Sequence, residues 1–210
     1  MLQLRHFQKF YGRNKILDIP DWYLPPGGYW LQGDNGSGKT TFLRSIAGLT
    51  PFKGEISLNE HSLRKTPVAY RRAITWADAE PLYPGFLTGE ELLAFYRDIQ
   101  QPPAGQIDQL VSRFGIASWL PSRASTWSTG MAKKLSLLLA FIGRPSLMIL
   151  DEPLITLDQP VIDILIDLLI TYQQFNGVSF IFSSHQNPPK ELLDVTKRLS
   201  IKNESIYLLD

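Results

Sequence analysis

A glycine-rich segment with a lysine and two threonines carries the most specific chemistry in this 210-residue chain. It consists of Gly33, Asp34, Asn35, Gly36, Ser37, Gly38, Lys39, Thr40 and Thr41. Residues 33–40 fit the pattern G-x-x-x-x-G-K-[ST], a loop whose backbone N–H groups point at phosphate oxygens. In such a loop, Lys39 brings positive charge to the β- and γ-phosphates, and the Thr40 hydroxyl is placed to bind Mg²⁺. The segment therefore predicts a site for a nucleoside triphosphate with magnesium.

Two adjacent carboxylates, Asp151 and Glu152, follow an apolar run far along the chain. The run, Leu147 to Leu150, is typical of a parallel strand buried on both faces. Such a strand delivers the residues after it to the carboxyl edge of the sheet, where ligands of open α/β sheets bind. We expect the carboxylates and the phosphate loop to form one site that binds and hydrolyses a nucleoside triphosphate.

The elements that position these segments alternate between strand and helix patterns. A strand is predicted at Tyr29–Leu31 and a helix after Thr40, so that a helix N-terminus would face the phosphates. Thr88 to Ile99 is predicted to be an amphipathic helix, with Thr88 as N-cap and Glu91 as its capping-box partner. Further strands are predicted at residues 2–6, 56–58, 73–76 and 178–182, and further helices at 107–114, 130–142 and 161–174. This order predicts an α/β fold with a mostly helical insertion at about residues 84–143.

Composition and charge exclude several classes of protein. The chain has no cysteine, which excludes disulfides and thiolate metal sites and suits a reducing compartment. Its net charge of +1 gives no reason to expect nucleic acid as a partner. No signal-peptide core follows Met1, and the most apolar stretches, residues 135–142 and 161–170, are too short to span a bilayer. We therefore expect an intracellular chain that does not cross a membrane by itself.

Two other classes of phosphate-loop protein fit less well. A GTPase needs a base-reading N-K-x-D after the loop, whereas Asn14 and Lys15 precede it here and Asp18 lies one residue too far. A small-molecule kinase would not need a glutamate directly after the acidic strand.

The segment Trp127-Ser128-Thr129-Gly130-Met131 resembles the LSGGQ signature of the ATP-binding cassette (ABC) ATPases. It precedes the two carboxylates at the spacing of that family, and the resemblance covers nearly all of the chain. It implies one ABC ATPase domain over residues 1–210. The fold implied is a P-loop NTPase core of the ABC type with an antiparallel β subdomain and an inserted helical subdomain at about 84–143.

The resemblance also implies roles for residues around ATP and Mg²⁺. Tyr11 matches the aromatic residue that stacks on adenine, and Phe7 and Phe10 are neighbouring aromatic alternatives. Asp151, together with Thr40, is implied to bind Mg²⁺. The catalytic pair is Glu152, which polarises the attacking water, and His185, which senses the γ-phosphate.

A second group of residues is implied to act on the ATP held by another subunit: Ser128, Thr129, Gly130 and Asp158. Near the start of a helix, the amides around Gly130 and the Ser128 hydroxyl would meet a γ-phosphate. The alternative for Ser128 is a plain helix cap. Thr129 stands where the family pattern has its first glycine. Asp158 matches a loop that touches the opposite site, and it is also suited to cap the helix that follows.

The chain departs from the family pattern after the predicted strand that ends at Trp76. The family has a glutamine there, which contacts Mg²⁺ or water and connects to the transmembrane partner. Here the sequence is Ala77-Asp78-Ala79-Glu80. Either Asp78 or Glu80 could supply the missing oxygen.

The resemblance implies the ATP-binding and ATP-hydrolysing subunit of a membrane ABC transporter. Such a subunit is cytoplasmic and peripheral at the inner face of the cell membrane. It drives separate transmembrane subunits as an ATP-dependent head-to-tail homodimer, or as a heterodimer with a related cassette. The Ser-Thr-Gly-Met variant of the signature favours an exporter. The alternative is a soluble ABC ATPase of an iron–sulfur or DNA-maintenance assembly. The substrate is not encoded in this chain, because in this family the membrane partner selects it.

Overall fold

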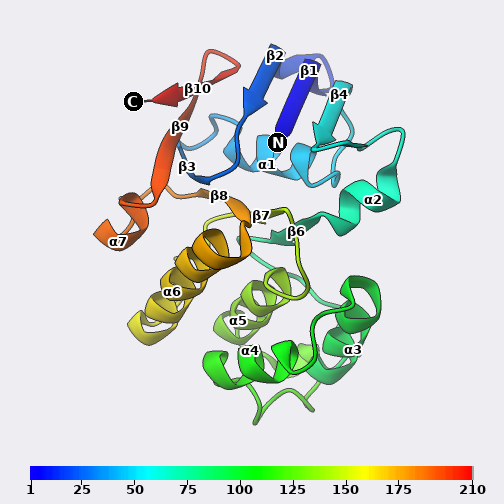
Figure 1. Ribbon diagram of the computed structural model, residues 1–210, viewed down its shortest axis with the longest axis vertical. Helices are drawn as coiled ribbons and strands as arrows, with labels where there is room; N and C mark the ends of the chain where they lie inside the picture. The colour runs from blue at the N-terminus through cyan, green and yellow to red at the C-terminus, as the bar shows by residue number, and fades with distance from the viewer. Residues whose placement is uncertain (210) are drawn as a thin grey trace.

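The structure is a computed structural model that describes residues 1–209, so the last residue of the expected 1–210 domain lies outside it. A six-stranded sheet crosses the middle of the molecule (Figure 1), with an antiparallel sheet and α1 on one side and α3 to α6 on the other. The α/β fold class with an antiparallel β subdomain is confirmed.

The antiparallel sheet has the order β2-β1-β4-β5, formed by β1 (Leu2–Tyr11), β2 (Asn14–Leu24), β4 (Lys53–Leu58) and β5 (His61–Ser62). The alternation of Leu2 and Leu4 with polar neighbours predicted β1, and both leucines are fully buried. They share a core with α1 (Lys39–Ile46), which contributes Phe42 and Leu43. This core fixes α1, and with it the end of the phosphate loop.

The larger sheet has the order β10-β9-β3-β8-β7-β6. Its strands are β3 (Gly28–Gln32), β6 (Ile74–Ala77), β7 (Leu147–Leu150), β8 (Ser179–Ser183), β9 (Thr196–Lys202) and β10 (Ser205–Leu209). Neighbouring strands are parallel except β10, which pairs antiparallel with β9. The phosphate loop and both carboxylates therefore follow parallel strands at the same edge of the sheet.

The apolar run of β7 is buried on both faces of the sheet. Leu147 and Ile149 belong to the core shared with the antiparallel sheet and α1. Met148 and Leu150 belong to a second core, built with the helices on the opposite face. This double burial is why the run is apolar without alternation.

Helices occupy the segment between β6 and β7: α3 (Gly89–Gln100), α4 (Gln106–Phe114), the short 3-10 helix η1 (Ala124–Thr126) and α5 (Thr129–Ala140). The predicted capping box starts α3, since the Thr88 N–H donates to Glu91 Oε2 at 2.8 Å and the Glu91 N–H donates to Thr88 Oγ1 at 3.2 Å. The chain leaves the sheet after β6 and returns beside it as β7.

Besides α1, three helices of the described residues lie outside this segment: α2 (Pro67–Arg72), α6 (Gln159–Asn176) and α7 (Lys190–Leu193). Within residues 1–209, no helix combines the length and apolar character needed to cross a bilayer. The strand predicted at residues 73–76 is displaced by one residue, because Ile74 and not Ala73 is the first residue paired with β7. The elements β2, β5, α2, η1, α7, β9 and β10 were not predicted.

Candidate nucleotide-binding site

The phosphate loop turns sharply between the end of β3 and the first turn of α1. Gly36 and Gly38 have φ angles of 79° and 100°, a region that favours glycine. A Cβ added at Gly33 would lie 2.8 Å from Ser37 Oγ. The loop therefore needs its glycines both for backbone angles and for the close approach of its two ends.

Lys39 is the first residue of α1, and its side chain folds back over the loop. Nζ donates to the Gly33 carbonyl at 2.7 Å and to the Asp34 carbonyl at 3.2 Å. The residue is only 8% exposed. These contacts hold the ammonium inside the curve of the loop, where it can reach a phosphate.

Asp151 follows β7 and is buried, with 1% of its surface exposed. Its Oδ1 accepts a hydrogen bond from Ser183 Oγ at 2.6 Å. Its Oδ2 is buried and has no hydrogen-bond partner in the described structure. A buried oxygen of this kind costs free energy unless a ligand or cation satisfies it.

Glu152 has a φ angle of 44°, which is rare for a residue with a side chain. Its N–H donates to Ser183 Oγ at 2.9 Å, so one serine contacts both acidic residues. Its Oε2 lies 3.1 Å from His185 Nδ1. Backbone strain at a hydrogen-bonded carboxylate is typical of functional sites.

Lys39, Glu152 and His185 line one pocket of about 510 Å³, and Asp151 is buried next to Glu152. The pocket is lined by Tyr11, Ile16, Asn35, Gly36, Gly38, Lys39, Thr40, Thr41, Ala79, Glu80, Glu152, Ile155 and His185. Phe7, one alternative to Tyr11, is fully buried in the core. Tyr11 is 53% exposed at the rim, and its ring centroid lies 4.4 Å from Lys9 Nζ.

Some predicted residues lie beneath or beside the pocket. Ser37 Oγ is buried under the loop without a hydrogen-bond partner in the described structure. Gly33 and Asp34 line a smaller neighbouring cavity, which shares His185 with the main pocket. The structure thus brings the phosphate loop, both carboxylates and the histidine together.

The two candidates for the missing glutamine lie in different surroundings. The Asp78 carboxylate accepts from Arg44 at 3.0 Å and from Trp76 Nε1 at 3.3 Å, so it is held beside α1. Of these two residues, Glu80 is the one that lines the nucleotide pocket.

Ser128, Thr129, Gly130 and Asp158 do not line this pocket. Ser128 caps α5 by accepting from the Met131 N–H at 3.2 Å. Asp158 caps α6 through the Val161 N–H at 3.4 Å and pairs with Lys134 at 3.3 Å. Ser128, Thr129 and Asp158 are exposed, so within one chain they lie at the protein surface and outside the pocket.

Two functional candidates were missed because sequence patterns give them no distinct signal. Ser183 was predicted only as part of a Ser-Ser-His segment, although its hydroxyl contacts Asp151 and Glu152. Lys133 is 1% exposed, although a lysine after the signature would ordinarily be solvated. Burial lowers the pKa of Lys133 to about 8, partly opposed by Asp151, Asp78, Glu152 and Glu80.

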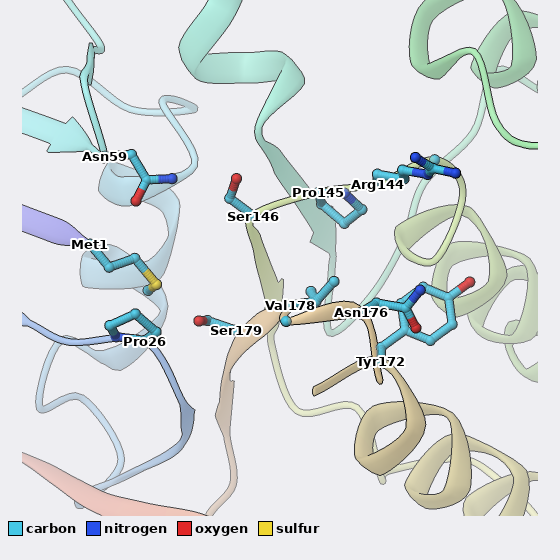
Figure 2. Close-up of a pocket in the computed structure, with 12 residues that line it drawn as sticks. Met1, Pro26, Asn59, Arg144, Pro145, Ser146, Tyr172, Asn176, Val178 and Ser179 are labelled. Atoms are coloured by element: carbon cyan, nitrogen blue, oxygen red, sulfur yellow. The ribbon is translucent and has the colours of Figure 1, made fainter. Parts of the chain in front are cut away.

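A second pocket, of about 360 Å³, lies at the opposite edge of the sheet (Figure 2). It is bounded by Met1, Pro26 and the segments that enter β7 and β8. None of the predicted site residues lines it. The phosphate loop, Glu152 and His185 therefore belong to the pocket at the carboxyl edge of the parallel strands and not to this second pocket.

A phosphate loop and paired carboxylates at the carboxyl edge of one parallel sheet define a P-loop nucleoside triphosphatase. The sequence model of the ABC transporter family matches residues 19–155. The cytochrome c biogenesis ATP-binding export protein CcmA of Legionella pneumophila is 30% identical over 92% of this chain and 97% of its own length. The chain belongs to the ABC transporter family, and it is an ATP-binding, ATP-hydrolysing domain of that family.

Two further comparisons agree with this assignment. ATP-binding cassette sub-family A member 7 of Rattus norvegicus is 31% identical over 92% of the chain, but the chain spans only 9% of that protein. A solved structure described as the ATP binding subunit of an ABC transporter has a TM-score of 0.88 and 26% identity, and the match covers all of this chain and 90% of that one.

Proposed function

We propose that this chain is the ATPase subunit of a membrane transporter, an exporter, whose transmembrane subunits are separate polypeptides. The observation that carries this proposal is that the predicted site residues form two groups. One group lines the nucleotide pocket, and the other lies at the exposed start of α5. The export direction is supported by the CcmA relative, which is named as an export protein.

The pocket residues have separate roles in binding and hydrolysing ATP. Tyr11 stacks on the adenine, while Lys39 and the loop amides hold the β- and γ-phosphates. Glu152 accepts a proton from the attacking water, and His185 orients Glu152 through the contact between Nδ1 and Oε2. The water then attacks the γ-phosphorus, so ADP leaves and phosphate is released.

The donor set fits Mg²⁺, which commonly binds through one or two carboxylates together with substrate phosphates. Asp151 Oδ2 and the Thr40 hydroxyl would hold it, with the Ser183 hydroxyl keeping Asp151 in orientation. When bound, the ion neutralises charge on the β- and γ-phosphates.

Ser183→Ala is expected to raise the Mg²⁺ concentration needed for half-maximal ATPase activity by about 10- to 100-fold, the usual range for losing a partner of a metal ligand. The matched control is Ser179→Ala on the same strand, because Ser179 Oγ accepts from Gly27 N–H and lies at the other edge of the sheet. An Mg²⁺ titration of ATP hydrolysis measures both. Equal requirements in the two variants would remove Ser183 from this role.

We further propose that hydrolysis requires a head-to-tail dimer, as a homodimer or with a related cassette. The exposed start of α5 would close on the ATP of the other subunit, where the helix N-terminus favours a γ-phosphate. A side chain at residue 130 would meet no clash within this chain, since a Cβ there would lie 3.7 Å from the Thr156 carbonyl oxygen, an ordinary van der Waals contact. Asp158 lies beside this surface through its ion pair with Lys134 of α5.

Gly130→Asp is expected to prevent ATP-induced dimer formation, because its carboxylate would repel the incoming γ-phosphate. Light scattering with Mg·ATP in a Glu152→Gln background measures the dimer. Binding of ATP to the monomer should survive, because the Lys39 loop is unchanged. Ala104→Asp adds the same charge at an exposed site before α4 and should dimerise normally. A normal dimer in the Gly130→Asp protein would leave Ser128 as a plain helix cap.

The proposal of a membrane partner is supported by exposed apolar side chains in the loop after β6 and on α3. Leu82 and Phe86 are 94% and 72% exposed in the loop after β6, and Phe95 is 59% exposed on α3. If these side chains form one contiguous patch, such a patch is typical of surfaces that bind other proteins. A transmembrane subunit seated there would place the chain at the cytoplasmic face of the membrane.

Membrane fractionation of cells that express the tagged chain tests this proposal. The chain should sediment with membranes and co-purify in detergent with an integral protein, and Leu82→Ser with Phe86→Ser should release it. Tyr207→Ser, a change at an exposed aromatic residue on β10, serves as the control. A wild-type chain that never associates with membranes would favour the soluble assembly ATPase instead.

A further inference from the structure

Lys133 makes three hydrogen bonds that neither ATP binding nor hydrolysis explains. It lies within α5 and is almost fully buried. Its Nζ donates to the carbonyls of Asp78, Ala79 and Asp151 at 2.8, 3.1 and 3.2 Å. These three bonds use all the N–H donors of an ammonium group. The side chain does not line the nucleotide pocket.

A buried ammonium is costly to desolvate, so its partners indicate what the group does. The partners here are backbone carbonyls from two segments that are far apart in sequence. One segment follows β6 and the other follows β7, so Lys133 joins the ends of two neighbouring strands to a helix. Bonds to carbonyls fix the path of the backbone at those ends.

Each joined segment carries an acidic residue of the pocket. Glu80 directly follows Ala79, and Glu152 directly follows Asp151. The helix that carries Lys133 begins at Thr129, one turn away, between the exposed Ser128 and the half-buried Gly130. The Lys133 side chain therefore transmits a displacement of the start of α5 to the backbone segments that directly precede Glu80 and Glu152 in sequence.

We propose that Lys133 is a positioning residue that couples the start of α5 to Glu80 and Glu152 of the chain's own nucleotide pocket. This inference rests on the proposed function, in which α5 contacts the second subunit. When α5 moves toward the neighbouring nucleotide, the hydrogen bonds of Lys133 Nζ move the ends of β6 and β7 with it. The glutamates then reach their hydrolytic positions only when the dimer is closed.

The test is a comparison of Lys133→Met with wild type in the full chain. Methionine keeps most of the apolar stem and removes all three donors. We expect kcat for ATP hydrolysis to fall by about 10- to 100-fold, as when an outer-shell partner is lost. The Kd for ATP, measured by calorimetry, should change by less than about 3-fold, because the phosphate loop is untouched. Lys133→Arg restores donors and should recover part of the lost kcat.

The matched control is Tyr70→Phe, which removes another buried hydrogen bond to a carbonyl, from Tyr70 Oη to the Ile46 carbonyl at 2.7 Å. It should lower the Tm without a comparable loss of kcat below the Tm. If Lys133→Met does not fold, Lys133→Gln, which keeps two donors, is measured against the same expectations.

Three results would overturn the inference: an unchanged kcat, a loss of ATP affinity as large as the loss of kcat, or an equal loss of kcat in Tyr70→Phe. A failure of the proposed function looks different. In that case the wild-type chain itself would form no ATP-induced dimer and would not associate with membranes.

Discussion

Glu152→Gln is expected to lower kcat for ATP hydrolysis by about 10²- to 10⁴-fold, the usual contribution of a general base, while Mg·ATP stays bound. Glutamine has nearly the same shape as glutamate but cannot accept the proton of the attacking water. The N–H bond from residue 152 to Ser183 Oγ involves only the backbone and should persist. The substitution therefore separates binding from hydrolysis.

Single-turnover hydrolysis and equilibrium binding of ATP measure the two effects separately. The control is Glu90→Gln, which makes the same change at an exposed position in the first turn of α3. Turnover at the wild-type rate in Glu152→Gln would move the catalytic role to another residue, with His185 as the next candidate.

Lys39→Ala is expected to weaken ATP binding by about 10²- to 10⁴-fold, since it removes charge-assisted hydrogen bonds to two phosphates worth about 1.5–3 kcal/mol each. The side chain also loses its bonds to the Gly33 and Asp34 carbonyls. These carbonyls belong to a loop at the edge of the sheet, so the two hydrophobic cores should remain folded.

Calorimetry gives the ATP affinity, and circular dichroism shows whether the fold persists. Lys65→Ala is the control, because its ammonium makes only a solvent-exposed ion pair with Glu55 at 3.5 Å. Tight ATP binding by a folded Lys39→Ala protein would contradict the assignment of the phosphate loop.

Local patterns were sufficient for the elements that depend on local chemistry. The capping box at Thr88 and Glu91 predicted the start of α3, because both bonds of the box lie within one turn. The apolar run before Asp151 predicted β7, since a strand buried on both faces has no polar side. The phosphate loop was predictable because its glycines and its lysine serve one narrow geometry.

Elements that depend on distant partners were not predictable in the same way. β2 contains Pro20 between two aspartates, a pattern that opposes a strand, yet β2 lies at the edge of its sheet, where proline is tolerated. The β9–β10 turn uses Asn203 and Glu204 with positive φ angles of 48° and 62°, and Glu204 carries no turn signal.

The candidate site shows the same limit. The choice between Asp78 and Glu80 depends on Arg44, which removes Asp78 from the pocket, and that contact joins residues 34 positions apart. The burial of Lys133 depends on two strand ends that only the folded sheet brings together. Sequence spacing carries no information on either contact.

The position of β3 in its sheet has a consequence for the order in which the protein assembles. β3 lies between β8 and β9, so both of its partners come from residues after 178. Pairings between segments so distant in sequence form late and slowly. During synthesis at about 5–20 residues per second, the strand that leads into the phosphate loop waits for about 7–30 seconds with both edges unpaired.

A nascent chain released before residue 179 would thus contain every residue of the loop from Gly33 to Thr41 but neither strand that supports it. Its exposed β3 edges would also be available to pair with other chains, which is a route to aggregation. Nucleotide binding is therefore a late event in biogenesis, and a chaperone that shields β3 would act on a segment that is made early and paired late.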